Sequence, residues 1–219
     1  MDMREKVDIY VPCYNCGPFL RKVLASLTNQ TVGFENIVVV DDGSLVPAKD
    51  IASEFGAIYV RHETNLGLAQ ARNSGIRHCT NSLVASVDAD CVLSESWLET
   101  LLPHFEQSDI AIVSGRLIET NTEKMADKWR CLHLKQDWGP TMVNDPNWIF
   151  GNNTIIRRNV LLEVGLYESK YRTNGEDLYI SRKVKERRLR TVYDPRALAY
   201  HLRSDDLRSV STSFWRWRS

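Results

Sequence analysis

The sequence predicts an α/β fold in which a mainly parallel, Rossmann-like sheet is flanked by helices. In the first half of the chain, short apolar runs alternate with segments whose apolar residues have helical spacing. Runs that are apolar without alternation are typical of parallel strands covered on both faces. The expected strands are Val7–Val11, Ile37–Val40, Ile58–Val60, Leu83–Val87 and Ile110–Val113, and the expected helices are Phe19–Gln30, Ala48–Phe55, Leu68–His78 and Ser96–Phe105.

Polar clusters directly follow three of these strands. They are Cys13–Asn15, Asp41–Ser44 and Asp88–Asp90. Because open parallel sheets bind ligands beyond the carboxyl ends of their strands, the sequence predicts a site at this edge.

The second half of the chain is less regular. Residues 120–147 are polar, include three tryptophans when counted to Trp148, and have few strand signals, so they predict a helix-and-loop excursion that covers a site. The other expected elements are a kinked strand Trp148–Arg157, a helix Asn159–Val164, a basic helix from Asn174 to about Arg188, and short strands Thr191–Tyr193 and Ala197–Tyr200. Because no linker interrupts the pattern, we expect a single domain over residues 1–219.

Composition excludes several classes of protein. The 219 residues are 43% hydrophobic and 26% charged, which is enough apolar material for a core and argues against disorder. No apolar run approaches the ~20 residues of a membrane span, and the start MDMREKVDIYV lacks a signal-peptide core. Five cysteines are an odd number for a disulfide framework. We therefore expect a cytoplasmic protein with free thiols.

The zero net charge hides a basic end. Residues 182–219 contain eleven Lys or Arg and four Asp or Glu, so they carry +7 and the rest of the chain −7. This pattern suggests an anionic partner, although a solvated helix face with a loose tail explains it equally well. With Phe214, Trp215 and Trp217, the tail could touch anionic lipid at the inner face of a membrane, or these rings could simply pack. No aromatic ladder accompanies the basic residues, so we expect no nucleic acid partner.

One motif with possible metal chemistry is Asp88-Ala89-Asp90, although such a pair of aspartates also occurs often by chance. In an extended segment the two carboxylates project to the same side, where they can share a divalent cation and its diphosphate ligand. The alternative is a turn whose acids cap the helix that follows.

Four other sets of side chains carry possible chemistry. Asp41 and Asp42 could accept a hydrogen bond from a nucleobase, or could form a turn. Glu176 and Asp177 open a helix, whose dipole keeps a carboxylate ionised as a general base requires; simple capping is the alternative. His201 follows a strand, and it could be a structural histidine or a metal ligand. Cys13 and Cys16 invite a redox interpretation, which would leave the aspartates without a role.

Together these motifs resemble those of the family 2 glycosyltransferases with a GT-A fold. The matching text, in chain order, is VDIYVPCYN, IVVVDDGS, NLGLAQARNSGI, VDADC, WIFGNNTIIRRNVLLEVGLYE, NGEDLYISRKV and AYHLRS. The resemblance runs from residue 7 to about 203. It implies a nucleotide-binding half to about residue 115 and an acceptor-binding half from about residue 116.

The resemblance also implies roles for individual residues. Its nucleotide-binding positions are Pro12, Tyr14, Asp41 or Asp42, Arg72 and Asp88. Asn152 matches a contact to the donor sugar, and Asp90 and His201 match ligands of a divalent metal, Mn²⁺ or Mg²⁺. Asp177 matches the catalytic base, with Glu176 beside it.

The activity implied is a metal-dependent, inverting transfer of a sugar from a nucleotide-diphosphate sugar, by family habit a UDP-sugar. The acceptor would be a hydroxyl of a sugar or a lipid-linked molecule, in cell-surface polysaccharide or glycolipid synthesis. Ser213 stands where processive members carry Gln in Gln-x-x-Arg-Trp, which argues against a processive synthase. The alternatives are a sugar-phosphate nucleotidyltransferase, although no glycine-rich loop follows the first strand, and a catalytically inactive binding module of the same fold.

Overall fold

A mixed sheet organises the chain, of which the computed structural model describes residues 5–218, without the side chains of residues 216–218. Its strands are β1 (Val7–Cys13), β2 (Ile37–Asp41), β3 (Ile58–Arg61), β4 (Leu83–Val87), β5 (Cys91–Leu93), β6 (Ile110–Glu119), β7 (Val143–Asn144), β8 (Asn153–Arg157) and β9 (Arg190–His201). They are ordered β3-β2-β1-β4-β8-β6-β9-β5, and β7 pairs with β9 beside this path.

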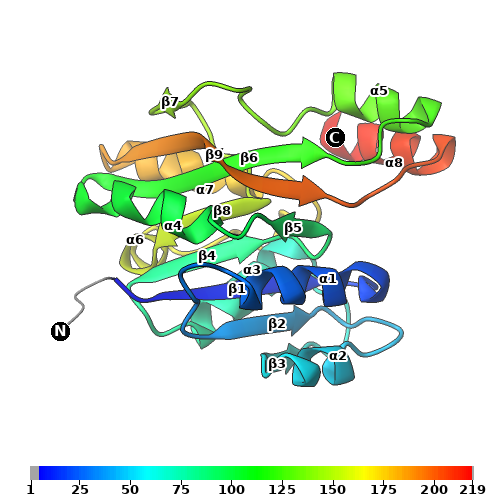
Figure 1. Cartoon of the computed structure of the whole chain (residues 1–219), viewed down its shortest axis with the longest axis horizontal. Helices are drawn as coiled ribbons and strands as arrows, with labels where there is room; N and C mark the ends of the chain where they lie inside the picture. Colours follow the sequence, from blue (N-terminus) through cyan, green and yellow to red (C-terminus); the bar gives the residue numbers. More distant parts are fainter. Residues whose placement is uncertain (1–4, 219) are drawn as a thin grey trace.

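The first four strands form the parallel part of the sheet. β1 lies between β2 and β4, and β3 follows β2, with Ile9 opposite Ile37 on one side and Ala85 on the other. The prediction of parallel apolar strands is confirmed for this half. The carboxyl ends of these strands share one edge, at the right of Figure 1, where the polar clusters of the sequence follow them.

The remaining strands make the sheet mixed. β8 is antiparallel to both β4 and β6, β9 is parallel to β6, and β5 is antiparallel to β9. The two short strands expected near the end of the chain are one strand, β9. Its register against β6 shifts between Tyr193 and Leu198, and this interval accommodates Pro195, which has no N–H for the ladder.

Helices cover both faces of the sheet (Figure 1). They are α1 (Gly17–Thr28), α2 (Lys49–Glu54), α3 (Leu68–His78), α4 (Trp97–Leu101), the 3-10 helix η1 (Leu102–Glu106), α5 (Met125–His133), α6 (Arg158–Glu163), α7 (Glu176–Glu186) and α8 (Leu207–Arg218). The helices α1 and α4 lie on the face nearer the viewer, and α3, α6 and α7 lie on the opposite face.

Two apolar cores result from the alternation of side chains along the strands. In β1, Ile9 packs into the core that contains Leu24 and Trp97, whereas its neighbour Tyr10 packs into the core that contains Ile76. All five side chains are essentially inaccessible to solvent. Burying such a side chain contributes roughly 1.5–3 kcal/mol, so both faces of the sheet stabilise the edge that carries the polar clusters.

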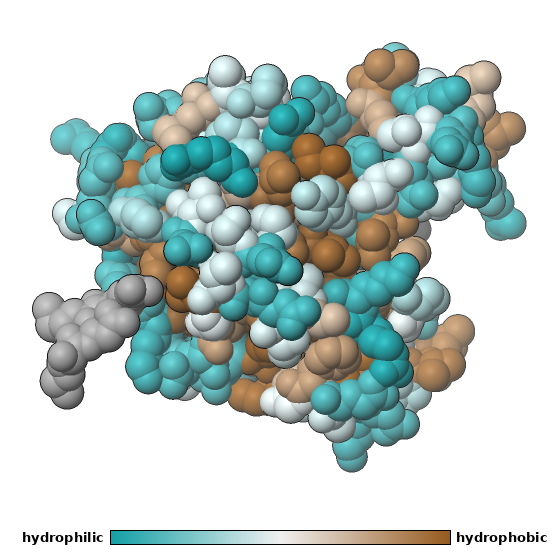
Figure 2. Space-filling model, in the orientation of Figure 1, coloured by the Kyte–Doolittle hydropathy of each residue, from teal (hydrophilic) through white to brown (hydrophobic). Residues whose placement is uncertain are grey.

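The helices α5 and α8 pack together beyond the carboxyl edge of the sheet, at the upper right of Figure 1. The basic end of the chain is therefore helical as far as residue 218 and is not a loose tail. Large apolar side chains remain exposed on this pair, namely Met125, Leu132, Leu207 and Trp215, and Figure 2 shows brown atoms gathered there. Among the described residues, none of the helices combines the length and the hydropathy that crossing a membrane requires.

The expectation that all five thiols are free is wrong for two of them. Cys13, at the end of β1, and Cys16, just before α1, are joined in a disulfide. Cys79, Cys91 and Cys131 are free, and the first two are buried. The disulfide closes the loop that contains Tyr14 and Asn15, and Asn15 adopts a left-handed conformation with φ of 54°.

The segment from Asp88 to Asp90 is not extended, as the sequence had suggested. The chain turns here, and the N–H of Cys91 donates to the carbonyl oxygen of Asp88 at 3.0 Å. The short strand β5 follows, which the sequence analysis did not foresee. Because of the turn, the carboxylates of Asp88 and Asp90 contact different partners.

The packing of α3 on β1 depends on the absence of a side chain at Gly75. A Cβ at this position would lie 2.5 Å from the ring of Tyr10. We expect Gly75→Ala to destabilise the fold, because overpacking costs about 1–3 kcal/mol and exceeds the gain of about 1 kcal/mol from better helix propensity. Thermal unfolding of the parent and the variant checks this. Gly17→Ala at the start of α1, where a Cβ meets nothing within 4 Å, should not lower the melting temperature. A Gly75→Ala protein as stable as its parent would contradict the packing described.

Candidate active site

Two adjoining pockets open at the carboxyl edge of the sheet. The larger, of about 410 Å³, includes Asp177, Asn152 and Trp148 in its lining, and the smaller, of about 300 Å³, includes Pro12, Tyr14 and Asp90. Asp88 and Leu68 line both pockets. A ligand that extends from one pocket to the other therefore passes Asp88.

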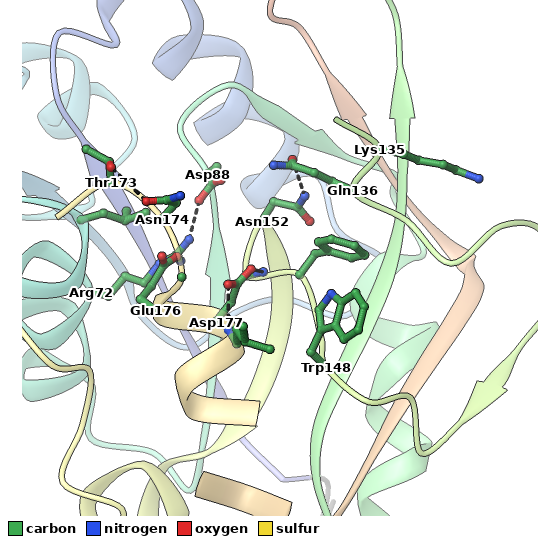
Figure 3. Close-up of a pocket in the computed structure, with 15 residues that line it drawn as sticks. Arg72, Asp88, Lys135, Gln136, Trp148, Asn152, Thr173, Asn174, Glu176 and Asp177 are labelled. Carbon is green, nitrogen blue, oxygen red and sulfur yellow. Dashed lines mark hydrogen bonds and ion pairs between the residues drawn. The ribbon is translucent and has the colours of Figure 1, made fainter. Parts of the chain in front are cut away.

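The first turn of α7 forms one wall of the larger pocket. Gly175 precedes the helix with φ of 85°, a left-handed conformation that glycine adopts without steric cost. The carboxylate of Asp177 accepts a hydrogen bond from the N–H of Gly151 at 3.1 Å and lines the pocket (Figure 3). Asp177 thus lies at the end of the helix that carries the partial positive charge of the helix dipole.

A buried arginine lies beneath the junction of the two pockets. The guanidinium of Arg72 donates to the hydroxyl of Ser86 at 2.5 Å and to Asp88 at 2.9 Å, and it lies 3.3 Å from a carboxylate oxygen of Glu176 (Figure 3). Burial raises the pKa of Glu176 to about 7, and Arg72 opposes this rise only in part. The predicted role of Arg72 as a nucleotide contact stays a prediction, since these partners already engage its guanidinium.

Asp90 and His201 come together on the other side of Asp88. The Nε2 atom of His201 lies 3.3 Å from a carboxylate oxygen of Asp90, and one potential ligand atom from each of Asp90, Cys91 and His201 falls within a group spanning 4.8 Å. Burial alone would lower the pKa of His201, but its hydrogen bonds with Asp90 and Glu119 outweigh burial and raise it to about 9. The structure thus brings the two predicted metal ligands into contact.

Side chains that the sequence analysis did not single out orient His201. Its Nδ1 atom lies 3.0 and 3.1 Å from the two carboxylate oxygens of Glu119, which also accepts a hydrogen bond from Arg130 at 2.8 Å. Arg130 is buried and donates to Asp205 as well, at 2.9 Å, so it links α5 to the segment before α8. No local sequence signal marks these residues, because 82 positions separate Glu119 from His201.

The two candidate base-reading aspartates are buried and bonded within the protein. Asp41 accepts hydrogen bonds from the backbone of Ser44 and Ala48 and from the side chains of Tyr59 and Arg61, at 2.6–3.0 Å. Their combined effect exceeds the effect of burial, so the pKa of Asp41 is lowered.

Asp42 has equally complete bonding. It contacts His62 at 2.7 Å and accepts from the N–H groups of Leu66 and Gly67 at 2.9 and 2.8 Å. Neither Asp41 nor Asp42 lines either of the two pockets described above. The protein thus holds the two carboxylates in similar ways, and a base contact by Asp41 or Asp42 stays a prediction.

The first loop supplies the outer wall of the smaller pocket. Tyr14 is 53% exposed and lines this pocket, so its side chain is accessible to a ligand there. The disulfide of Cys13 and Cys16 fixes the loop at its base, and Asn15 ties it to the loop after β2 through hydrogen bonds with Ser44 and Leu45, both at 2.9 Å.

The larger pocket has an aromatic wall that the sequence analysis gave no role. Trp148 and Phe150 line it, next to Gln136, whose side chain accepts a hydrogen bond from Asn152 at 3.1 Å. The sequence did show that tryptophans gather in this region. It could not show that they face the pocket that contains Asp177.

Comparison with known proteins identifies the family of the chain. A family model described as glycosyl transferase family 2 matches residues 8–167. The chain belongs to glycosyl transferase family 2. In sequence it is similar to the pre-mycofactocin glycosyltransferase of Mycobacterium tuberculosis, with 28% identity over 211 residues. That match covers 92% of this chain and 44% of the relative, so the chain spans less than half of the relative's length.

Solved structures confirm the GT-A fold of this family 2 chain. The mannosyltransferase PcManGT from Pyrobaculum calidifontis, in complex with GDP-Man and Mn²⁺, matches with a TM-score of 0.75 and 19% identity, over 99% of this chain and 61% of its own. GalNAc-T7 with UDP, GalNAc and Mn²⁺ matches with a TM-score of 0.74 and 18% identity, over 92% of this chain and 44% of its own.

Glu176 makes the stability of the fold depend on pH. Its pKa is about 7 in the folded protein and 4.5 ordinarily, so the folded state binds more protons than the unfolded state between these values. The free energy of unfolding should therefore decrease, through this group, as the pH rises from 4.5 to 7. Urea denaturation across this range should show a smaller decrease for Glu176→Gln than for the parent. Glu163→Gln, at the exposed end of α6, is the control and should keep the parental slope. Equal slopes in the parent and Glu176→Gln would exclude the burial described.

Proposed function

We propose that this chain is a metal-dependent, inverting glycosyltransferase that moves a sugar from a nucleotide-diphosphate sugar to an acceptor hydroxyl. One observation carries the proposal: Asp177 lines a pocket that meets, at Asp88, a second pocket lined by Asp90 and Tyr14. Direct displacement requires a base on one side of the anomeric carbon and a site for the leaving group on the other. Two pockets that share Asp88 suit this arrangement. Membership of glycosyl transferase family 2 supports the same chemistry.

We assign the metal to Asp90 and His201. Carboxylate oxygen and imidazole nitrogen suit Mn²⁺, and a carboxylate with substrate diphosphate suits Mg²⁺, so the side chains fit such an ion. When bound, the ion supplies positive charge that stabilises the leaving diphosphate. The Mn²⁺ named with PcManGT and with GalNAc-T7 supports this assignment.

The nucleotide would occupy the smaller pocket. Tyr14 can stack on the base beside Pro12, and Asp88 lies where the ribose and diphosphate would pass towards Asn152 and the donor sugar. Arg72 would act through Asp88, which it orients from beneath. A UDP-sugar remains our proposed donor, although one of the two structural relatives is named with GDP-Man and the other with UDP.

Asp177 would take the proton from the acceptor hydroxyl. As the O–H bond breaks, the hydroxyl oxygen would attack the anomeric carbon from the side opposite the diphosphate. The bond between that carbon and the diphosphate oxygen breaks, the nucleoside diphosphate leaves with the electron pair, and the configuration inverts. The hydrogen bond from Gly151 holds the carboxylate in place at the helix N-terminus. Glu176 is buried beside Arg72, which suits a supporting role rather than direct contact with the acceptor.

The acceptor hydroxyl belongs, in this proposal, to a sugar or a lipid-linked molecule of the cell surface. Peripheral contact of the basic end with a membrane stays a prediction. The exposed apolar side chains of α5 and α8 support it in part, and the side chain of Trp217 lies outside the described residues.

Replacing the base should separate chemistry from binding. We expect Asp177→Asn to lower sugar transfer by about 10²- to 10⁴-fold, because general base catalysis contributes about that factor. Binding of UDP with Mn²⁺ should survive, measured by calorimetry. Asp50→Asn, on the exposed face of α2, is the control and should transfer normally. Unchanged turnover in Asp177→Asn would reject the assignment, and release of pyrophosphate from a nucleoside triphosphate and a sugar phosphate would favour a nucleotidyltransferase.

Replacing Glu119 should weaken the metal site without touching a ligand. We expect Glu119→Gln to lower the affinity for Mn²⁺ by about 10- to 100-fold, because carboxylates that orient a metal-bound histidine have effects of this size. Electron paramagnetic resonance of unbound Mn²⁺ measures the affinity directly. Glu123→Gln, in the exposed loop before α5, serves as the matched control. An Mn²⁺ affinity equal to that of the parent would show that Glu119 does not support a metal ligand.

A further inference from the structure

The aromatic wall of the larger pocket stands beside the proposed base. Trp148 and Phe150 line the same pocket as Asp177, and Figure 3 shows Asp177 between Trp148 and the cluster of Arg72 and Glu176. The wall is thus on the side of Asp177 away from Arg72. A molecule lying against it would present its edge to the carboxylate of Asp177.

The wall is built as a rigid surface. The ring of Trp138 lies behind it, with its centroid 4.8 Å from that of Trp148 and 6.1 Å from that of Phe150, and the two wall rings are 6.3 Å apart. The indole N–H of Trp138 donates to the carbonyl oxygen of Trp148 at 3.1 Å. Trp148 and Phe150 are only partly buried, so their outer surfaces remain available to a ligand.

Polar groups surround the rings and restrict what the wall can bind. Gln136 and Asn152, hydrogen-bonded to each other, form one margin of the pocket, and Asp177 adds charge. A hydrocarbon chain would remove these groups from water and leave them unpaired, at a cost for each buried polar group. A ligand with an apolar face and a polar rim satisfies both the rings and their surroundings.

We propose that Trp148 and Phe150 form an acceptor subsite for a pyranose ring, so that the acceptor is a carbohydrate hydroxyl rather than a lipid alcohol or a peptide side chain. A pyranose has a face of C–H groups that can lie on an indole and a rim of hydroxyl groups that can reach Gln136 and Asp177. This inference rests on the proposed function, and it adds the substrate class and the residues that select it.

The experiment measures the binding of simple acceptor probes. Octyl glucoside, octyl galactoside and octyl N-acetylglucosaminide, below their micelle concentrations, are compared with octanol and with a serine-containing peptide, each in the presence of UDP and Mn²⁺. We expect at least one glycoside to bind to the parent protein, as measured by saturation-transfer NMR and calorimetry. Its Kd should rise about tenfold or more in Trp148→Ala, which corresponds to about 1.4 kcal/mol.

Matched variants distinguish ring contact from general damage. Trp148→Phe keeps an aromatic face and should retain most of the glycoside affinity, whereas Trp148→Leu keeps bulk without a ring and should lose it. Trp215→Ala removes an exposed tryptophan of α8 outside the pocket and should bind like the parent. If Trp148→Ala does not fold, the comparison of the Leu and Phe variants decides.

Several results would overturn the subsite. The first is that Trp148→Leu and the parent bind the glycosides with equal affinity. The second is that octanol or the peptide binds and none of the glycosides does. The third is that none of the probes binds. The binding of UDP with Mn²⁺ is followed separately in each protein. Its loss in the parent would reject the proposed function, whereas intact UDP binding with glycoside binding indifferent to Trp148 would reject the subsite alone.

Discussion

The buried guanidinium of Arg72 is the interaction on which the candidate site depends. It reaches Ser86 on β4, Asp88 beyond the end of that strand and Glu176 at the start of α7. An unpaired charge in this position would be costly, so the three partners and the arginine stabilise one another only as a set. Through Arg72 the parallel part of the sheet fixes the relative position of the two pockets.

A second buried arginine has the corresponding role at the other end of the site. Arg130 contacts Glu119, which orients His201, and it also contacts Asp205 in front of α8. The pairing of β5 with β9 brings Cys91 opposite His201, so the turn that contains Asp90 and the end of β9 are adjacent through the backbone as well. The corner proposed to bind the metal is thus defined by residues from the middle and the end of the chain.

Local patterns in the sequence were sufficient for much of the parallel half. The bounds of α3 and β4 agree with those predicted, because helical spacing and an uninterrupted apolar run are properties of neighbouring residues. The strand β8 was expected within the longer segment Trp148–Arg157, but its antiparallel pairing was not, and the three-residue strand β5 was not expected at all. Their pairing depends on partners far away in the sequence, and short strands carry little pattern of their own.

The site divides in the same way. Asp90, His201 and Asp177 could be named from motifs, and the fold explains how Asp177 and Asp90 come to line adjoining pockets while His201 contacts Asp90. Glu119, Arg130 and the aromatic wall could not, because their importance comes from what they touch. The turn at Asp88 shows the limit of the local argument: a two-residue spacing predicts one orientation in a strand and another in a turn.

The disulfide at the end of β1 makes the oxidation state of the sample part of its chemistry. Cys13 and Cys16 border the loop that contributes Tyr14 to the smaller pocket, whereas the three free cysteines lie elsewhere in the chain. Protein prepared with a thiol reductant and protein prepared without one are therefore two covalently different species at the surface that would meet a nucleobase. Affinities for nucleotides are comparable between laboratories only when the number of titratable thiols is stated with them.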